Sequence, residues 1–148
     1  MRISSKGRYG LAAMISMAQN FKNDEYITII SIAEGLGISK IYLEQVFSLL
    51  KRAELVTSIK GSQGGYKLAM PATKISIGRI MRSVEGGLFE KTESSVSDDA
   101  RSIDKAMETL VWDSLDHAIS NTLDSVMLSD LINEAEKHKE GKDFMFYI

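Results

Sequence analysis

The chain has 148 residues, 44% of them hydrophobic, which is enough for a domain with a core. It contains no cysteine, and this excludes disulfides, thiolate nucleophiles, zinc fingers and cysteine-held iron–sulfur clusters. No apolar stretch reaches membrane-spanning length, and the N-terminus lacks a signal-peptide pattern. We therefore expect a soluble cytoplasmic protein that contacts no membrane and carries no metal or cofactor.

The net charge of −2 hides an uneven distribution. Residues 1–85 contain 12 Lys or Arg and 6 Asp or Glu, whereas residues 86–148 contain 6 Lys or Arg and 14 Asp or Glu. A basic region suits a polyanionic partner and an acidic region does not. The N-terminal part is therefore the predicted nucleic-acid-binding region, although charge can also drift along a chain by chance.

The first predicted helix covers residues 5–20, where apolar side chains recur at helical spacing after the capping residues Ser4 and Ser5. Gly7 and Gly10 lie inside it. Small residues at these positions permit either close helix packing or close approach to a phosphate.

A second, shorter helix is expected to start at Thr28 or Ser31 and to stop at Gly35 and Gly37. Ile38 follows in the turn, where an apolar residue usually fills the core between two helices.

The third predicted helix begins after Ser39, a good N-terminal cap, and ends near residue 53. One face of this helix is apolar and is expected to build the core: Leu43, Val46, Leu50 and Ala53. The other face carries groups that can read or approach DNA: Lys40, Glu44, Ser48 and Lys51, with Gln45 and Arg52 at its edge.

A basic hairpin follows this helix. Residues 55–59 and 66–70 predict two strands, and Lys60 to Gly65 form a glycine-rich turn between them. Its three glycines allow positive φ angles and a thin tip that can come close to another molecule.

The C-terminal part predicts further helices. A fourth helix begins at Ser76 and closes at the Gly86–Gly87 pair, and residues 90–99 form a polar loop. A long helix of residues 100–123 carries an apolar stripe that a second copy of the chain could cover: Ile103, Met107, Leu110, Val111, Leu115, Ala118 and Ile119. A last short helix is expected from Ser129 to about Lys139, followed by an aromatic tail of residues 143–148.

No constellation of residues indicates catalysis. His117 and His138 lie in acidic helical surroundings without a matching nucleophile, and no paired carboxylates stand out. Trp112 is expected to anchor an interface or a core, and the wall of a ligand pocket is the alternative. The chain is therefore not predicted to be an enzyme.

The order of helix, turn, helix and basic hairpin is that of a winged helix-turn-helix, which binds double-stranded DNA. Gln45 could pair with adenine, Lys40 with guanine and Glu44 with cytosine, while basic side chains would contact phosphates. The predicted DNA-binding residues are Arg2, Lys6, Ser39, Lys40, Tyr42, Glu44, Gln45, Ser48, Lys51, Arg52, Lys60, Gly61, Ser62, Gln63, Gly64 and Tyr66.

Four segments together resemble the Rrf2 (Rrf-two) family of bacterial winged-helix transcription regulators: RISSKGRYGL, YLEQVFSLLKRAELV, KGSQGGYKL and ISIGRIMRSVEG. The resemblance implies a homodimer that binds an inverted-repeat operator, generally to repress transcription. Three positions depart from the family pattern: Lys60 replaces the usual Arg, Glu54 the usual Gly, and Gly87 a frequent Pro.

The predicted fold is thus mainly α with a small β-hairpin wing, a winged helix-turn-helix plus a long dimerisation helix. Residues 1–87 form the DNA-binding domain, 88–99 the polar loop, and 100–148 the dimerisation helix and C-terminal tail.

Cluster-binding members of the family carry three cysteines in the loop that here reads EKTESSVSDD, and this chain has none. The resemblance is therefore strongest to the repressors of cysteine metabolism, which also lack these three cysteines, end in a manner similar to the terminal MFYI and act with cysteine synthase. It implies that Tyr147 and Ile148 dock on that enzyme, although the aromatic tail could equally pack on the dimer.

Three alternatives stay open. A cysteine-free member of the family could regulate another pathway. A protein-interaction module could modulate an enzyme through its tail, with DNA binding vestigial. A small-molecule sensor could hold its ligand in a pocket between the long helix and the wing domain.

Overall fold

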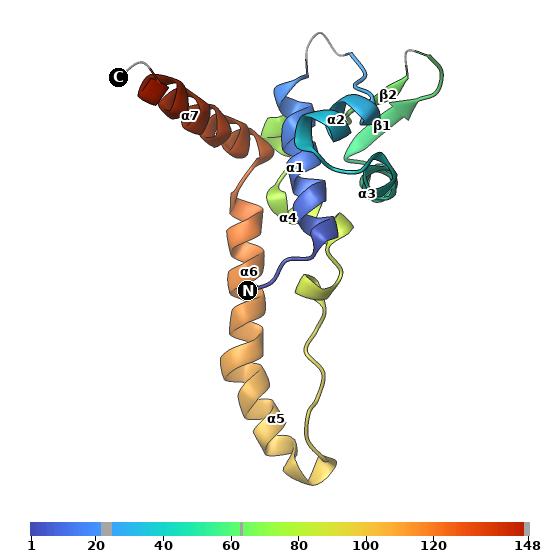
Figure 1. Ribbon diagram of the computed structural model, residues 1–148. Helices are drawn as coiled ribbons and strands as arrows, with labels where there is room; N and C mark the ends of the chain where they lie inside the picture. Colours follow the sequence, from blue (N-terminus) through green and yellow to red (C-terminus); the bar gives the residue numbers. More distant parts are fainter. Residues whose placement is uncertain (22–24, 63, 147–148) are drawn as a thin grey trace.

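The computed structural model describes residues 1–21, 25–62 and 64–146. It is mainly helical, with one two-stranded antiparallel hairpin, so the predicted fold class is confirmed. The short helices and the hairpin gather at one end of the molecule, and a long helix extends away from them (Figure 1). Among the described residues, no helix is both long and apolar enough to cross a bilayer.

Three helices open the chain: α1 (Ser5–Gln19), α2 (Ile29–Leu36) and α3 (Lys40–Arg52). The hydroxyl of Ser4 accepts the amide N–H of Gly7 at 3.0 Å and thereby caps α1. Of the two alternative starts for α2, Thr28 is the cap, because its hydroxyl accepts the N–H of Ser31. Gly37 ends α2 in the left-handed conformation, with φ 67°.

Gly7 and Gly10 are buried, and each allows a neighbouring helix to approach α1 closely. A Cβ atom at Gly7 would lie 2.6 Å from a carboxylate oxygen of Glu85, and one at Gly10 would lie 3.1 Å from Val84. The expectation of close helix packing is therefore confirmed. The alternative of close approach to a phosphate is wrong, because protein atoms already fill both positions.

The hairpin consists of β1 (Val56–Ile59) and β2 (Gly65–Leu68), paired from Val56 with Leu68 to Ile59 with Gly65. The second strand is thus shifted towards the N-terminus relative to the predicted 66–70. Pairing continues one step beyond the strands, since the Ala69 N–H donates to the Leu55 carbonyl at 3.0 Å.

A short turn of 3₁₀ helix, η1 (Ala72–Lys74), leads into α4 (Ile77–Val84), which Ser76 caps as predicted. Together α1 to α4 and the hairpin enclose one hydrophobic core, in which 18 of the described apolar residues are buried. Leu128 belongs to this core although it lies far along the chain, and it is fully buried.

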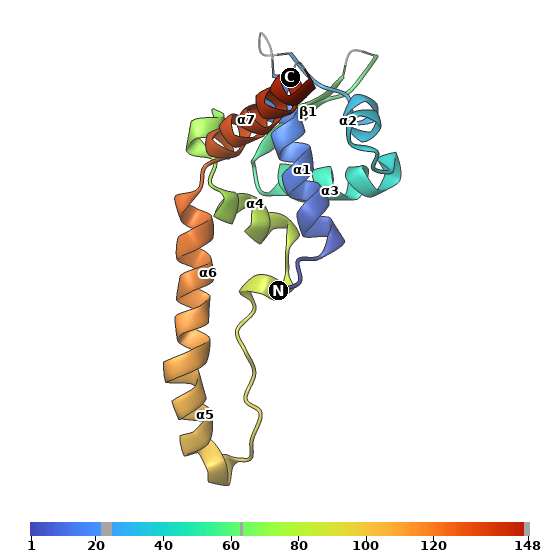
Figure 2. The same cartoon turned by 60° about the vertical axis from the view of Figure 1, so that its left-hand side comes forward.

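After η2 (Gly87–Phe89), the chain runs in extended form alongside the long helix and turns at η3 (Asp98–Ala100) (Figure 2). The long helix consists of α5 (Arg101–Met107), a π-helical stretch η4 (Glu108–Trp112) and α6 (Asp113–Ser125). At 1.5 Å per residue it is about 37 Å long. No residue in these three elements is buried.

The prediction for the last helix is wrong at both ends. The helix α7 (Leu128–Phe146) begins before Ser129 and continues beyond Lys139. Asp130 closes its first turn, because its carboxylate accepts the N–H of Met127 at 2.9 Å. A single glycine such as Gly141 only weakens a helix by about 1 kcal/mol and does not stop it. The predicted docking residues Tyr147 and Ile148 lie outside the described residues.

Candidate nucleic-acid interface

A tight turn joins α2 to α3 and sets their relative orientation. The N–H of Ile38 donates to the Ala33 carbonyl at 3.1 Å, just after the left-handed Gly37. Ser39 then caps α3, since its hydroxyl accepts the N–H of Tyr42 at 3.1 Å. Two helices joined by such a turn, with a hairpin after the second, have the arrangement of a winged helix-turn-helix.

The two faces of α3 differ as predicted. Leu43, Val46 and Leu50 are fully buried, and Ala53 is half-buried. The structure adds Phe47, also fully buried, which the predicted apolar face did not include. The opposite face is exposed and polar: Lys40, Glu44, Gln45, Ser48, Lys51 and Arg52.

On the exposed face, the ammonium group of Lys40 lies 3.6 Å from the carboxylate of Glu44, and both side chains are about half exposed. Such a pair contributes little to stability and can open when a base competes for either partner. Tyr42 differs from its neighbours, because it is half-buried and its ring packs edge-on against Tyr9, 5.0 Å between centroids.

The hairpin is anchored on the core through Tyr66. Its ring packs on Phe47 with centroids 4.7 Å apart, and its backbone pairs with Ile27 through hydrogen bonds of 2.7 and 2.8 Å. Ile27 thus extends the hairpin like a third strand, which the sequence patterns did not indicate. This pairing requires Gly65, because a Cβ there would lie 2.3 Å from the Ile27 carbonyl oxygen.

At the tip of the hairpin, Lys60, Gly61 and Ser62 are exposed, whereas Gly64 is half-buried. Gly61 has φ 117°, and a Cβ at Gly64 would lie 2.4 Å from the Ile59 carbonyl oxygen. These glycines are therefore needed to build the turn itself, and they also keep it thin. Gln63 lies outside the described residues.

The N-terminal candidates lie beside the start of α1. Arg2 is exposed and Lys6 is half-buried. The amide N–H of Ser4 donates to the buried carboxylate of Glu85 at 2.9 Å, which places a negative charge at the positive end of the α1 dipole. The structure tests no contact with DNA, so the assignments of all these residues stay predictions.

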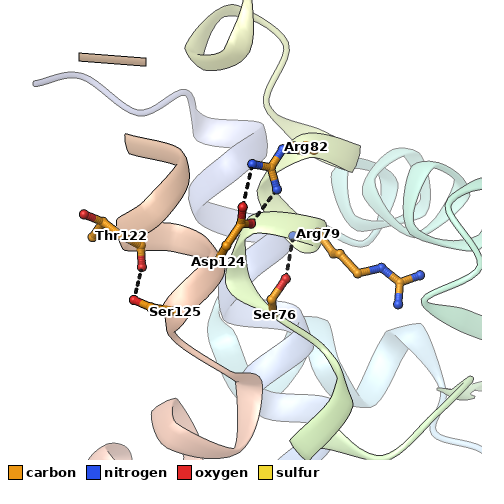
Figure 3. Close-up of polar contacts among 6 residues, drawn as sticks. All are labelled: Ser76, Arg79, Arg82, Thr122, Asp124 and Ser125. Atoms are coloured by element: carbon orange, nitrogen blue, oxygen red, sulfur yellow. Dashed lines mark hydrogen bonds and ion pairs between the residues drawn. The ribbon is translucent and has the colours of Figure 1, made fainter. Parts of the chain in front are cut away.

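A pair of charged side chains joins the long helix to the wing domain, which consists of α1 to α4 and the hairpin (Figure 3). The guanidinium of Arg82 on α4 donates two hydrogen bonds to Asp124 on α6, at 2.6 and 3.1 Å. This hydrogen bonding holds the pKa of Asp124 below its ordinary value and raises the pKa of Arg82. Asp124 lies directly over Gly78, where a Cβ would be only 1.8 Å from its carboxylate oxygen.

Backbone hydrogen bonds strengthen the same contact between the long helix and the wing domain. The N–H of Ile77 donates to the Val126 carbonyl, and the N–H of Leu128 donates to the Ile75 carbonyl, both at 2.8 Å. The end of the long helix is therefore fixed to α4 by main chain and side chains together.

The apolar stripe of the long helix has no cover within the described part of the chain. Ile103 is 55% exposed, Leu110 77% and Leu115 51%. Towards α6 the stripe reaches Ile119 and Leu123, which line an apolar cavity of about 430 Å³ between α1, α4 and α6.

The extended segment beside this helix is held by polar contacts. The carboxylate of Asp104 accepts hydrogen bonds from the Ser94 hydroxyl and the Ser95 N–H. Lys91 pairs with Glu108 at 3.1 Å. Lys105 and then Lys91 hydrogen-bond to Glu108 and hold its pKa below its ordinary value.

Trp112 is half-buried and lines a cavity of about 220 Å³ between this segment and the helix. The residues here do not fit the iron–sulfur cluster that the family resemblance implies for members with three cysteines in this loop. The segment offers hydroxyls, carboxylates and a lysine, and the chain has no thiolate to ligate iron.

The profile of the Rrf2 family, described as iron-dependent transcriptional regulators, matches residues 3–134. The chain thus belongs to the Rrf2 family and is a transcriptional regulator, not an enzyme. It is 33% identical over 136 residues to the HTH-type transcriptional regulator IscR of Klebsiella pneumoniae, covering 92% of this chain and 82% of IscR.

Two solved structures share this fold closely. The structure of CymR, the global cysteine regulator of B. subtilis, has a TM-score of 0.73 and 34% identity, covering 90% of this chain and 98% of CymR. The structure of T. potens IscR has a TM-score of 0.70 and 36% identity, covering 93% and 90% of the two chains. The predicted resemblance to a family of winged-helix regulators, CymR among them, is confirmed.

Proposed function

We propose that this protein binds double-stranded DNA, with α3 in the major groove and the hairpin tip against the flanking backbone. The observation that carries this proposal is the split of α3 into a buried apolar face and an exposed face on which most side chains can form hydrogen bonds. Lys60 at the exposed tip of the hairpin adds positive charge there.

The protein binds DNA as a homodimer in this proposal. The uncovered stripe from Ile103 to Leu115 supports this, because a large apolar surface on a monomer is unfavourable in water. A second copy related by a two-fold axis would cover it and would present two α3 helices to an inverted-repeat operator.

We further infer that the protein represses genes of cysteine or sulfur metabolism. The likeness to the global cysteine regulator CymR supports this assignment. Control of another pathway by a cysteine-free member of the family is the alternative. Operators recovered from the genome with the purified protein would decide between the two.

Docking of Tyr147 and Ile148 on cysteine synthase rests on the family resemblance alone. Deleting these two residues should weaken association of the full-length protein with the purified enzyme if the docking occurs. Unchanged association would end this part of the proposal.

Electrophoretic mobility shifts at increasing salt test DNA binding directly. Affinity should fall steeply with salt, because each phosphate contact releases counterions. Lys60→Ala should weaken binding to all duplexes and make the salt dependence shallower, whereas Gln45→Ala should relax the choice of base at one position. Lys139→Ala, an exposed lysine on α7, is the matched control and should change neither. If Lys60→Ala leaves affinity intact, the assignment of the hairpin as a DNA-binding wing is wrong.

A further inference from the structure

Ile41, in the first turn of α3, is an exposed apolar side chain that the fold does not use. Its side chain is 72% exposed, although the apolar residues that follow it, Leu43, Val46 and Phe47, are fully buried. A β-branched apolar residue in contact with water contributes no burial free energy to folding. Packing within the free chain therefore does not explain this residue.

The position of Ile41 on the helix is informative. At about 100° per residue, it falls between Ser48 and Gln45, within the exposed polar face and away from the core. It is the second residue of α3, and the N-terminal residues of a recognition helix are those that reach the base edges. Ile41 thus occupies a central place on the surface proposed to read DNA.

The major groove presents one prominent apolar group to such a side chain. Most groups along the base edges there are hydrogen-bond donors and acceptors, and the exception is the C5-methyl group of thymine. We propose that Ile41 is a specificity-determining residue that packs against a thymine C5-methyl group in each half-site. This inference rests on the proposed function, and it adds a base preference that the polar residues of α3 do not supply.

A protein partner is a weaker explanation of the same exposed side chain. Ile41 stands alone among polar and charged neighbours such as Lys40 and Ser48, whereas the exposed apolar residues of the long helix form a continuous stripe. An isolated methyl-bearing group within a polar surface matches an isolated methyl group on a polar base edge.

The test begins with a duplex selected from a random library by the full-length protein. Each thymine is then replaced singly by deoxyuridine, which removes only the methyl group. The affinities of wild type, Ile41→Ala and Ile30→Ala are measured for every duplex. Ile30 is the matched control, because it is also the second residue of its helix, α2, and is 51% exposed.

For wild type and Ile30→Ala, deoxyuridine at one thymine per half-site should weaken binding about fourfold, the loss expected for one buried methyl group. Ile41→Ala should bind the thymine duplex about sixteenfold more weakly, since it loses the contact in both half-sites, and it should be indifferent to that replacement. The inference is overturned if wild type tolerates every replacement, or if Ile41→Ala remains as sensitive as wild type. If wild type selects no duplex and shows no salt-dependent binding, the proposed function fails and this inference fails with it.

Discussion

The third helix and the long helix are both amphipathic, yet only the third helix has its apolar face covered. Leu43 and Leu50 on α3 are fully buried by their own chain, whereas Leu110 and Leu115 on the long helix are 77% and 51% exposed. The same amphipathic pattern therefore has two structural outcomes. In the wing domain it completes a core, and in the long helix it leaves a surface for another chain.

The largest effect on the free energy of unfolding is expected when leucine is replaced by alanine on the covered face of α3. The same replacement on the uncovered face of the long helix is the comparison. Leu50→Ala should lower the free energy of unfolding by about 2–5 kcal/mol, because it leaves a cavity in the core. Leu110→Ala should change it by less than about 0.5 kcal/mol at protein concentrations where single chains dominate. Urea unfolding followed by circular dichroism measures both. Equal losses would mean that Leu110 is buried within its own chain.

A charge on the stripe should separate the two copies. Leu110→Glu is expected to weaken the dimer about a hundredfold or more, since it places an unpaired carboxylate in an apolar interface. Sedimentation velocity over a range of concentrations gives the dissociation constant. Thr109→Glu adds the same charge at the neighbouring exposed position, off the stripe, and should leave the dimer intact. If both variants behave as wild type, the interface lies elsewhere.

The residue Glu54, which follows the end of α3, has a strained backbone conformation that a substitution can relieve. Glu54 has φ 60°, and it is the one described non-glycine residue with a positive φ. The N–H of Glu54 donates to Lys51 and that of Leu55 to Leu50, the hydrogen bonds of a Schellman motif, in which this position favours glycine. This geometry gives a physical reason for the glycine that the family resemblance leads us to expect at this position.

Glu54→Gly should therefore raise the free energy of unfolding by about 0.5–1 kcal/mol, after the greater entropy of an unfolded glycine is subtracted. Thermal unfolding measures the change. Glu54→Ala removes the same charge but keeps the strained conformation, and it should give no comparable gain. A similar gain in both variants would assign the effect to charge.

The wing domain could be predicted closely because its signals are local. The caps Ser4, Ser39 and Ser76 and the left-handed Gly37 lie where the sequence patterns placed them. What could not be predicted depends on contacts distant in the sequence. Nothing near Ile27 indicates that it pairs with Tyr66, and nothing near Leu128 indicates that it fills the N-terminal core.

The candidate site, too, has features that local sequence patterns predict and features that depend on contacts in the folded chain. The exposed polar face of α3 follows from periodicity, and Ile41 could have been found on it, because the helical repeat already places this apolar residue among the polar ones. The roles of Tyr42 and Tyr66 as packing residues depend on partners that only the folded chain brings together.

The contact of Arg82 with Asp124, between the wing domain and the long helix, should make the smallest contribution to the free energy of unfolding. The sign of its pH dependence follows from the pKa of Asp124. The pKa of Asp124 is lowered by the hydrogen bonds from Arg82, so the pair stabilises the folded state when the carboxylate is ionised. That contribution is present above the pKa of the unfolded chain, about 4, and is lost as the pH falls through the lower folded value. Exposure of both side chains to water keeps it small.

A double-mutant cycle of Arg82→Gln and Asp124→Asn, measured by urea unfolding at pH 7 and pH 3, isolates the interaction. The coupling should be favourable at pH 7 and weaker at pH 3, and its size should remain below the gain from Glu54→Gly. Lys137→Gln and Glu134→Gln, an exposed pair within α7, form the control cycle, since their loss leaves the contact of Arg82 with Asp124 untouched. A coupling between Arg82 and Asp124 that is equal at both pH values would show that shape alone, through the close contact with Gly78, holds the long helix to the wing domain.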